Sequence, residues 1–127
     1  MRKEQIVTDL APCPGGAYSQ GLKIGNYLWV ASQGPYDPIT RAIVGTTIEE
    51  QTAQSLDNVK AILEAGGATM ADVVKTTVHL SDVSLFAGFN KVYTSYFPDP
   101  KPVRTTVGSQ LFGSLVMIDA VAYIGED

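Results

Sequence analysis

One carboxylate interrupts an apolar segment near the end of the chain. Asp119 lies inside the run Leu-Val-Met-Ile-Asp-Ala-Val-Ala at residues 115–122, and a carboxylate on an apolar strand is costly unless it is paired or neutralised. Two interpretations stay open. Asp119 either pairs with a backbone amide or a basic side chain, or it serves as an acid/base group that positions water in a cleft between subunits.

Arg104 stands at the start of another β-prone segment, directly after Pro102-Val103. Its guanidinium offers a rigid fork of donors that matches a carboxylate. From its position alone, Arg104 is explained better as one half of a surface or interface ion pair. In a strand, Thr106 shares the face of Arg104 because alternate side chains point the same way, although β-propensity by itself also accounts for a threonine there.

Tyr18 follows a bend at residues 15–17, where its phenol can orient a ligand or simply pack. The cysteine and histidine side chains cannot pair with another of their own type, because Cys13 is the only cysteine and His79 the only histidine. These counts exclude an intramolecular disulfide, a zinc site of paired cysteines and a histidine-rich metal site, but not a carboxylate-rich one. Neither a dinucleotide fingerprint nor a Walker motif is present.

The composition is typical of one globular domain over residues 1–127. Hydrophobic residues make up 45% of the chain and charged residues 17%, and the formal net charge is −4. The basic residues are scattered, which argues against a nucleic-acid surface. No apolar run approaches the roughly 20 residues of a membrane helix, and no apolar stretch follows the basic N-terminus. With one cysteine, these features favour the cytoplasm.

A first helix is predicted over residues 48–65. Thr47 and Glu50 have capping-box spacing at its start, and Gly66-Gly67 provides a stop. Between them, apolar residues recur at helical spacing and form one stripe.

The remaining elements are predicted mainly as strands. Two short β-prone runs at 22–24 and 27–32 flank Gly25-Asn26 and indicate a hairpin, while residues 7–16 are expected to be irregular. Three more strands are predicted over residues 73–80, 103–109 and 115–124. An aromatic stripe predicts a second helix over residues 84–97.

This order favours an α+β fold in which two helices cover one face of a mixed sheet. Alternate residues of the last strand are apolar on both faces. Two helices can cover only one face, so we expect the other face to be buried by self-association with similar sheets.

Five segments extend over nearly the whole sequence in a fixed order and spacing: Ala17–Gln20, Gln51–Ala65, Asp72–Val78, Phe89–Tyr93 and Pro102–Val107. Together these segments resemble the RidA/YjgF family. The resemblance implies a chorismate-mutase-like fold and a homotrimer with clefts between subunits. It also implies hydrolysis of 2-aminoacrylate and related imines to 2-oxo acids and ammonia, without a metal or an organic cofactor.

The resemblance also implies roles for particular residues. Arg104 matches the arginine that binds the substrate carboxylate, Tyr18 a tyrosine that shapes the cleft, and Ser32 a serine at the end of the second strand. Asp119 takes the place of a glutamate that positions the attacking water, and its side chain is shorter by one methylene, about 1.5 Å. Thr106 stands where a cysteine is common, and its backbone is expected to help polarise the imine nitrogen.

The hypothesis is therefore a cytoplasmic trimer that deaminates a small imino acid held by Arg104, with water positioned by Asp119. The expected partners are this substrate and further copies of the chain, with no nucleic acid and no membrane. Two alternatives stay open. One is a trimer that binds a small carboxylate or a protein without turnover. The other is a deaminase of a larger enamine, such as an aminomuconate-type compound, which a wider cleft near Tyr36 and Phe112 would favour.

Overall fold

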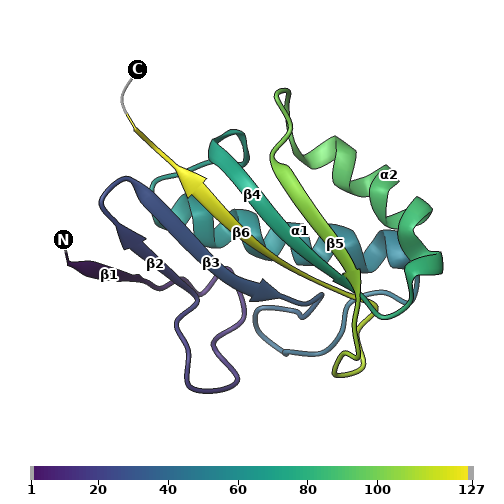
Figure 1. Cartoon of the computed structure of the whole chain (residues 1–127). Helices are drawn as coiled ribbons and strands as arrows, with labels where there is room; N and C mark the ends of the chain where they lie inside the picture. Colours follow the sequence, from purple (N-terminus) through teal and green to yellow (C-terminus); the bar gives the residue numbers. More distant parts are fainter. Residues whose placement is uncertain (1, 126–127) are drawn as a thin grey trace.

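The computed structural model describes residues 2–125 and consists of a six-stranded mixed sheet with two α-helices (Figure 1). The strand order across the sheet is β1-β2-β3-β6-β4-β5. The elements are β1 (Lys3–Ile6), β2 (Gly21–Ile24), β3 (Tyr27–Gln33), α1 (Ile48–Ala65), β4 (Val73–Leu80), α2 (Phe86–Tyr96), β5 (Val103–Gly108) and β6 (Val116–Tyr123). Within residues 2–125, no helix combines the length and apolar character needed to cross a membrane.

The bounds of α1 and of β4 confirm the predictions for residues 48–65 and 73–80. α1 begins after Thr47, whose hydroxyl accepts from the Glu50 amide, while the Glu50 carboxylate accepts from the Thr47 amide. The helix ends at Gly66, and Gly67 follows with a φ of 91°, a left-handed conformation that glycine adopts without steric cost. These signals are local in the chain, which is why spacing alone located the helix.

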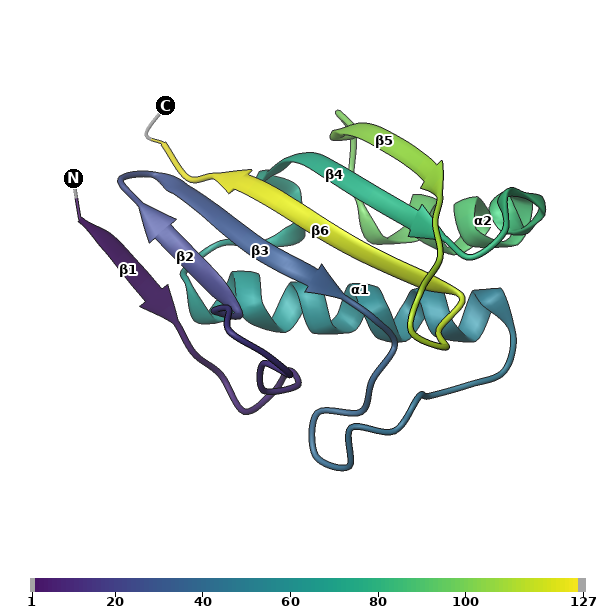
Figure 2. The same cartoon turned by 60° about the horizontal axis from the view of Figure 1, so that its bottom comes forward.

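Both helices lie on the same face of the sheet, as predicted (Figure 2). β4 and β5 are the only parallel neighbours among the described strands, and α2 makes the crossover that a parallel pair requires. The core fills the space between helices and sheet. Its fully buried side chains include Leu28, Leu56, Ile62, Leu63, Val78, Leu80, Phe89 and Ile118.

The opposite face of the sheet is uncovered and largely apolar. Trp29 is 49% exposed and Val103 67% exposed, and Tyr27 packs against Tyr123 on the same side, with ring centroids 4.9 Å apart. The expectation of an uncovered apolar face is therefore confirmed. Contiguous exposed apolar surface of this kind usually marks an interaction site.

Two elements differ from the predictions. The segment Lys3–Ile6 forms an edge strand, β1, paired with β2, although three of its four side chains are polar and give no strand pattern. The second helix was expected from residue 84 to 97, but residues 83–85 form a 3-10 turn capped by Asp82, and α2 starts at Phe86 and ends at Tyr96. In both cases the backbone hydrogen bonds set the bounds of the element, and side-chain periodicity does not predict those bounds.

Candidate functional site

The guanidinium of Arg104 lies on a platform of aromatic rings between β5 and α2. Its central carbon is 4.8 Å from the ring centroid of Tyr93, 5.2 Å from that of Phe86 and 5.4 Å from that of Phe89. A cation over aromatic faces is stabilised by their quadrupoles. The aromatic stripe of α2 thus supports a charge on the neighbouring strand as well as filling the core.

Hydrogen bonds hold this platform in place. The Arg104 Nη1 donates to Asn90 Oδ1 at 2.8 Å, and the hydroxyls of Tyr93 and Thr76 lie 2.7 Å apart. Burial raises the pKa of the Tyr93 phenol, although its bond to Thr76 and the charge of Arg104 oppose the shift. The phenol therefore stays neutral beneath the guanidinium.

No carboxylate neutralises Arg104 within residues 2–125. The one ion pair in this part of the chain joins Lys101 to Asp99 at 3.9 Å, and Asn90 offers Arg104 only a neutral amide oxygen. A half-buried guanidinium with one neutral partner keeps most of its donors for an anion. This observation argues against a structural ion pair within the chain.

Asn90 on α2 accepts a hydrogen bond from Arg104 on β5, a contact between distant segments that periodicity along the chain does not reveal, and we expect Asn90 to position the guanidinium. We expect Asn90→Ala to raise the KM for a carboxylate-bearing substrate at least about tenfold, because a hydrogen bond to a charged group contributes about 1.5–3 kcal/mol, with kcat nearly unchanged. Asn90→Asp should raise KM further, because its carboxylate competes for the guanidinium. Steady-state kinetics of both variants tests this. A fall in kcat with KM unchanged would contradict the positioning role.

Asp119 and Arg104 lie on opposite faces of the sheet. Arg104 pairs in register with Thr76 on the helix side, whereas Asp119 pairs with Thr77, and adjacent residues of a strand point to opposite faces. Thr106 shares the helix side with Arg104. Asp119 is half-buried on the uncovered face, where the sequence argument expected it. Within one chain the structure does not bring the proposed acid and the proposed anchor together.

A β-bulge faces Asp119 from the neighbouring strand. On β3, Val30 pairs with Ala120 and Gln33 with Ile118, so two residues of β3 oppose Asp119 alone. One of the two is Ser32, whose Oγ is buried without a hydrogen-bond partner. Bulges re-aim side chains and are common beside functional sites.

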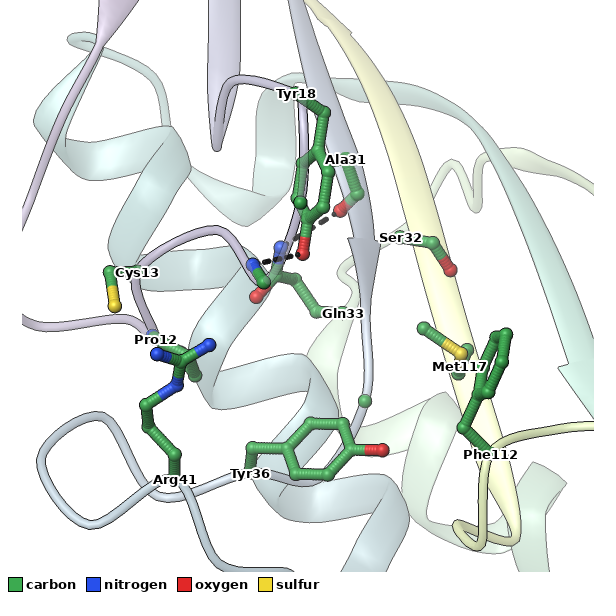
Figure 3. A pocket seen from close by; sticks show the side chains of 13 residues that line it. Pro12, Cys13, Tyr18, Ala31, Ser32, Gln33, Tyr36, Arg41, Phe112 and Met117 are labelled. Carbon is green, nitrogen blue, oxygen red and sulfur yellow. Dashed lines mark hydrogen bonds between the residues drawn. The ribbon is translucent and has the colours of Figure 1, made fainter.

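Ser32 and Tyr18 line one cavity of about 660 Å³. Figure 3 shows that side chains converge on it from the loop before β2, the end of β3, the loop after β3, and β6 with the loop before it. The lining residues are Pro12, Cys13, Gly15, Gly16, Tyr18, Ala31, Ser32, Gln33, Gly34, Tyr36, Arg41, Phe112 and Met117. Two of them are Tyr36 and Phe112, near which a wider cleft would favour a larger enamine.

Buried amides tie down the loops around this cavity. Gln20 is 3% exposed and donates to the carbonyls of Pro12, Thr8 and Ala11. Gln51 donates to the carbonyl of Gly45 and accepts from the amide of Leu115. Each amide satisfies loop backbone groups that would otherwise be buried without a partner.

Asn58 holds the loop after β3 by donating hydrogen bonds to its backbone carbonyls. Its side chain is 1% exposed and donates to the carbonyls of Gly34 at 3.1 Å and Tyr36 at 2.9 Å. No motif or spacing in the sequence predicts a role for these amides. The available signal was a polar side chain on the buried side of a helix, which needs hydrogen-bond partners.

Arg104 does not line this cavity. β5 is separated from β3 by β6 and β4, so the two strands lie about 14 Å apart across the sheet. In addition, the Arg104 side chain faces the helices. A small ligand could contact Arg104 together with Tyr18 or Ser32 only if different chains supplied them. Within residues 2–125, no group of three or more His, Cys, Asp or Glu side chains is arranged to hold a metal ion.

Curated relatives match almost the whole chain. A RutC family protein of Pyrococcus abyssi is 48% identical over 125 residues, covering 97% of this chain and 98% of the relative. A protein of Dermatophagoides farinae named 2-iminobutanoate/2-iminopropanoate deaminase is 38% identical over 106 residues, covering 84% of this chain and 83% of the relative.

Solved structures have the same fold. RidA from the Antarctic bacterium Psychrobacter sp. superimposes with a TM-score of 0.91 at 37% identity, covering 95% of this chain and 99% of that one. E. coli TdcF, solved with bound serine, superimposes with a TM-score of 0.90 at 32% identity, covering 96% and 99%. Residues 8–124 match the family described as Endoribonuclease L-PSP. The chain therefore belongs to this family, which includes the RidA/YjgF proteins.

Proposed function

We propose that this chain is a hydrolytic deaminase of reactive enamines and imines of the 2-aminoacrylate type, releasing a 2-oxo acid and ammonia. The observation that carries the proposal is the guanidinium of Arg104, which lies over three aromatic rings and has no carboxylate partner within residues 2–125. The name of the Dermatophagoides farinae relative and the serine in E. coli TdcF agree with a small amino-acid-like ligand.

The proposed reaction needs water and proton transfer. Arg104 holds the substrate carboxylate by paired hydrogen bonds, and the Thr106 backbone helps polarise the imine nitrogen. The nitrogen of the imine enters the reaction protonated, and Asp119 takes a proton from water as the water oxygen bonds to the imine carbon, giving a neutral carbinolamine. Asp119 returns that proton to the nitrogen, the carbon–nitrogen bond breaks and ammonia leaves, while the hydroxyl group loses its proton to solvent and becomes a carbonyl. The carbonyl remains on the 2-oxo acid.

The proposed active form is a homotrimer. Arg104 and Asp119 lie on opposite faces of one sheet, so one substrate can meet both only where different chains adjoin. The uncovered face, which carries Trp29 and Tyr123, offers the apolar surface for such packing. A cytoplasmic location remains part of the proposal and agrees with a single, exposed cysteine.

One observation favours a second candidate, deamination of a larger enamine of the aminomuconate type. The cavity beside Ser32 has a volume of about 660 Å³ and includes Tyr36 and Phe112 in its lining. Ligand pockets of roughly 300–1,000 Å³ suit drug-sized molecules, so this space exceeds the needs of a three-carbon imino acid. Comparing turnover of small and large enamines separates the two candidates.

The test is to generate 2-aminoacrylate in the presence of the protein and follow pyruvate. We expect Asp119→Asn to lower kcat about 100-fold, the usual contribution of a positioned acid/base group, while the affinity for 2-oxobutanoate stays within about twofold. Glu64→Gln, which neutralises an exposed carboxylate on α1, should change neither quantity.

Two outcomes would contradict the proposal. If the wild-type chain binds 2-oxobutanoate but does not accelerate pyruvate release over buffer, it is a binding protein. If Asp119→Asn keeps full turnover, another group positions the water. Sedimentation of the wild-type protein should give the mass of three chains, and a monomeric mass with full activity would remove the interface from the mechanism.

A further inference from the structure

Arg41 is an arginine in a backbone conformation that usually belongs to glycine. Its φ is 65°, in the left-handed region that few residues with side chains occupy. The turn around it enforces this geometry, because the Arg41 amide donates to the Asp37 carbonyl at 2.9 Å and the Asp37 amide donates to the Ala42 carbonyl at 2.8 Å. Strained positions of this kind concentrate at ligand sites.

The side chain of Arg41 extends from this turn to the rim of the cavity, toward the loop that precedes β2 (Figure 3). Its Nη2 lies 3.4 Å from the position that a Cβ on Gly15 would occupy. A Cβ at Gly15 would thus lie at van der Waals distance from the guanidinium. The Arg41 charge therefore lies directly beside the backbone of the loop that precedes β2.

This charge has no partner within residues 2–125. Lys101 and Asp99 make the one ion pair there. The nearest carboxylate in sequence, Asp37, accepts from the amides of Ile39 and Thr40, and these bonds lower its pKa. Asp37 is thus ionised, but its carboxylate already accepts hydrogen bonds from two amides of its own turn. The Arg41 guanidinium therefore remains available for an anion.

The rest of the cavity offers polar groups beside an apolar body. The Tyr18 oxygen accepts from the Gly15 amide at 3.1 Å, so its own proton is free to be donated. The Ser32 hydroxyl lies buried without a partner. Phe112 and Met117 provide apolar walls. A ligand that fits this lining has a short carbon chain and an acidic group at the end near Arg41.

We infer that Arg41 is a specificity-determining residue that selects substrates with a second acidic group. The substrate class is the 2-imino dicarboxylic acids, whose distal carboxylate is bound by Arg41 and whose first carboxylate is bound by Arg104 of an adjoining chain, because Arg104 of the same chain does not line this cavity. This inference rests on the proposed deaminase function and narrows its substrate. Because the reaction consumes 2-imino acids, a dehydrogenating or eliminating reaction of acidic amino acids must supply them.

The test compares two imines formed in situ by amino acid oxidases, 2-iminoglutarate and 2-iminobutanoate. The wild-type protein should have the higher kcat/KM for 2-iminoglutarate. Arg41→Asn removes the charge with a residue that tolerates positive φ, so folding is preserved. The variant should lower kcat/KM for 2-iminoglutarate about 10- to 100-fold, which is the contribution of a charge-assisted pair. Its kcat/KM for 2-iminobutanoate should stay within about twofold of the wild-type value. Lys60→Asn, on the exposed side of α1, is the matched control.

The outcomes separate this inference from the function on which it rests. If both imines are hydrolysed and Arg41→Asn affects them equally, Arg41 does not select the substrate and the deaminase function stands. If neither imine is hydrolysed, the deaminase function fails, and titration calorimetry with 2-oxoglutarate decides about the site. At least tenfold weaker binding by Arg41→Asn supports the anion site. Equal affinities, or no binding by the wild-type protein, overturn it.

Discussion

Arg104→Ala is expected to lower kcat/KM for a 2-imino acid by about 100- to 10,000-fold. The guanidinium has one neutral partner, Asn90 Oδ1 at 2.8 Å, and keeps donors for two hydrogen bonds to a carboxylate. Hydrogen bonds to charged groups contribute about 1.5–3 kcal/mol each, and each 1.4 kcal/mol corresponds to about a factor of ten. In situ generation of the imine, with the 2-oxo acid followed continuously, measures the loss.

Arg104→Lys separates geometry from charge. Lysine keeps the positive charge but loses the planar fork and the stacking on Phe86, Phe89 and Tyr93. We expect it to recover at most about a tenth of wild-type activity. Lys91→Ala removes an exposed cation from α2 and should leave activity unchanged. Arg104→Ala with wild-type kcat/KM would exclude this arginine as the anchor.

Asn58→Ala is expected to have the largest effect on stability among the loop-holding amides. The Asn58 side chain is 1% exposed, and its loss leaves the carbonyls of Gly34 and Tyr36 without their donor. Unsatisfied buried groups cost about 1–3 kcal/mol each, so we expect a loss of about 2–4 kcal/mol in the free energy of unfolding. Denaturant titration at fixed protein concentration measures it.

Gln54→Ala is the matched control for Asn58→Ala. The Gln54 Nε2 donates to Asn58 Oδ1 at 3.0 Å, but Gln54 is only half-buried, so its removal should cost less than about 1 kcal/mol. The Asn58 variant should also bind ligands of the cavity more weakly, because Gly34 and Tyr36 belong to the cavity wall. Equal stability of the two variants would show that other contacts hold this loop.

Sequence alone located the elements whose signals lie within a few residues of one another. The capping box at Thr47 and the glycine stop at Gly66 gave the bounds of α1, and a β-branched run gave those of β4. The aromatic stripe of α2 was also recognised, although its first turn was not. Alternation in β6 predicted that both faces of the sheet are apolar, and the structure confirms that one of them is uncovered.

Candidate site residues were singled out by type and by family motif, but their arrangement was not predictable. The sequence pointed to Arg104, Asp119, Tyr18 and Ser32. It contained no information that the proposed anchor, Arg104, and the proposed acid, Asp119, lie on opposite faces, because that depends on the register of β5 and β6 against β4. The bulge at Ser32 likewise arises from the register between β3 and β6.

Tertiary structure alone decided the features that depend on contacts between distant segments. β1 exists because β2 offers an unpaired edge. Arg41 reaches Gly15 because two loops meet at one end of the sheet, and Asn58 supports a loop that lies more than 20 residues before it. Periodicity and capping act along the chain and can be read from residue types. Strand register and loop packing are set by long-range pairing, which no local pattern encodes.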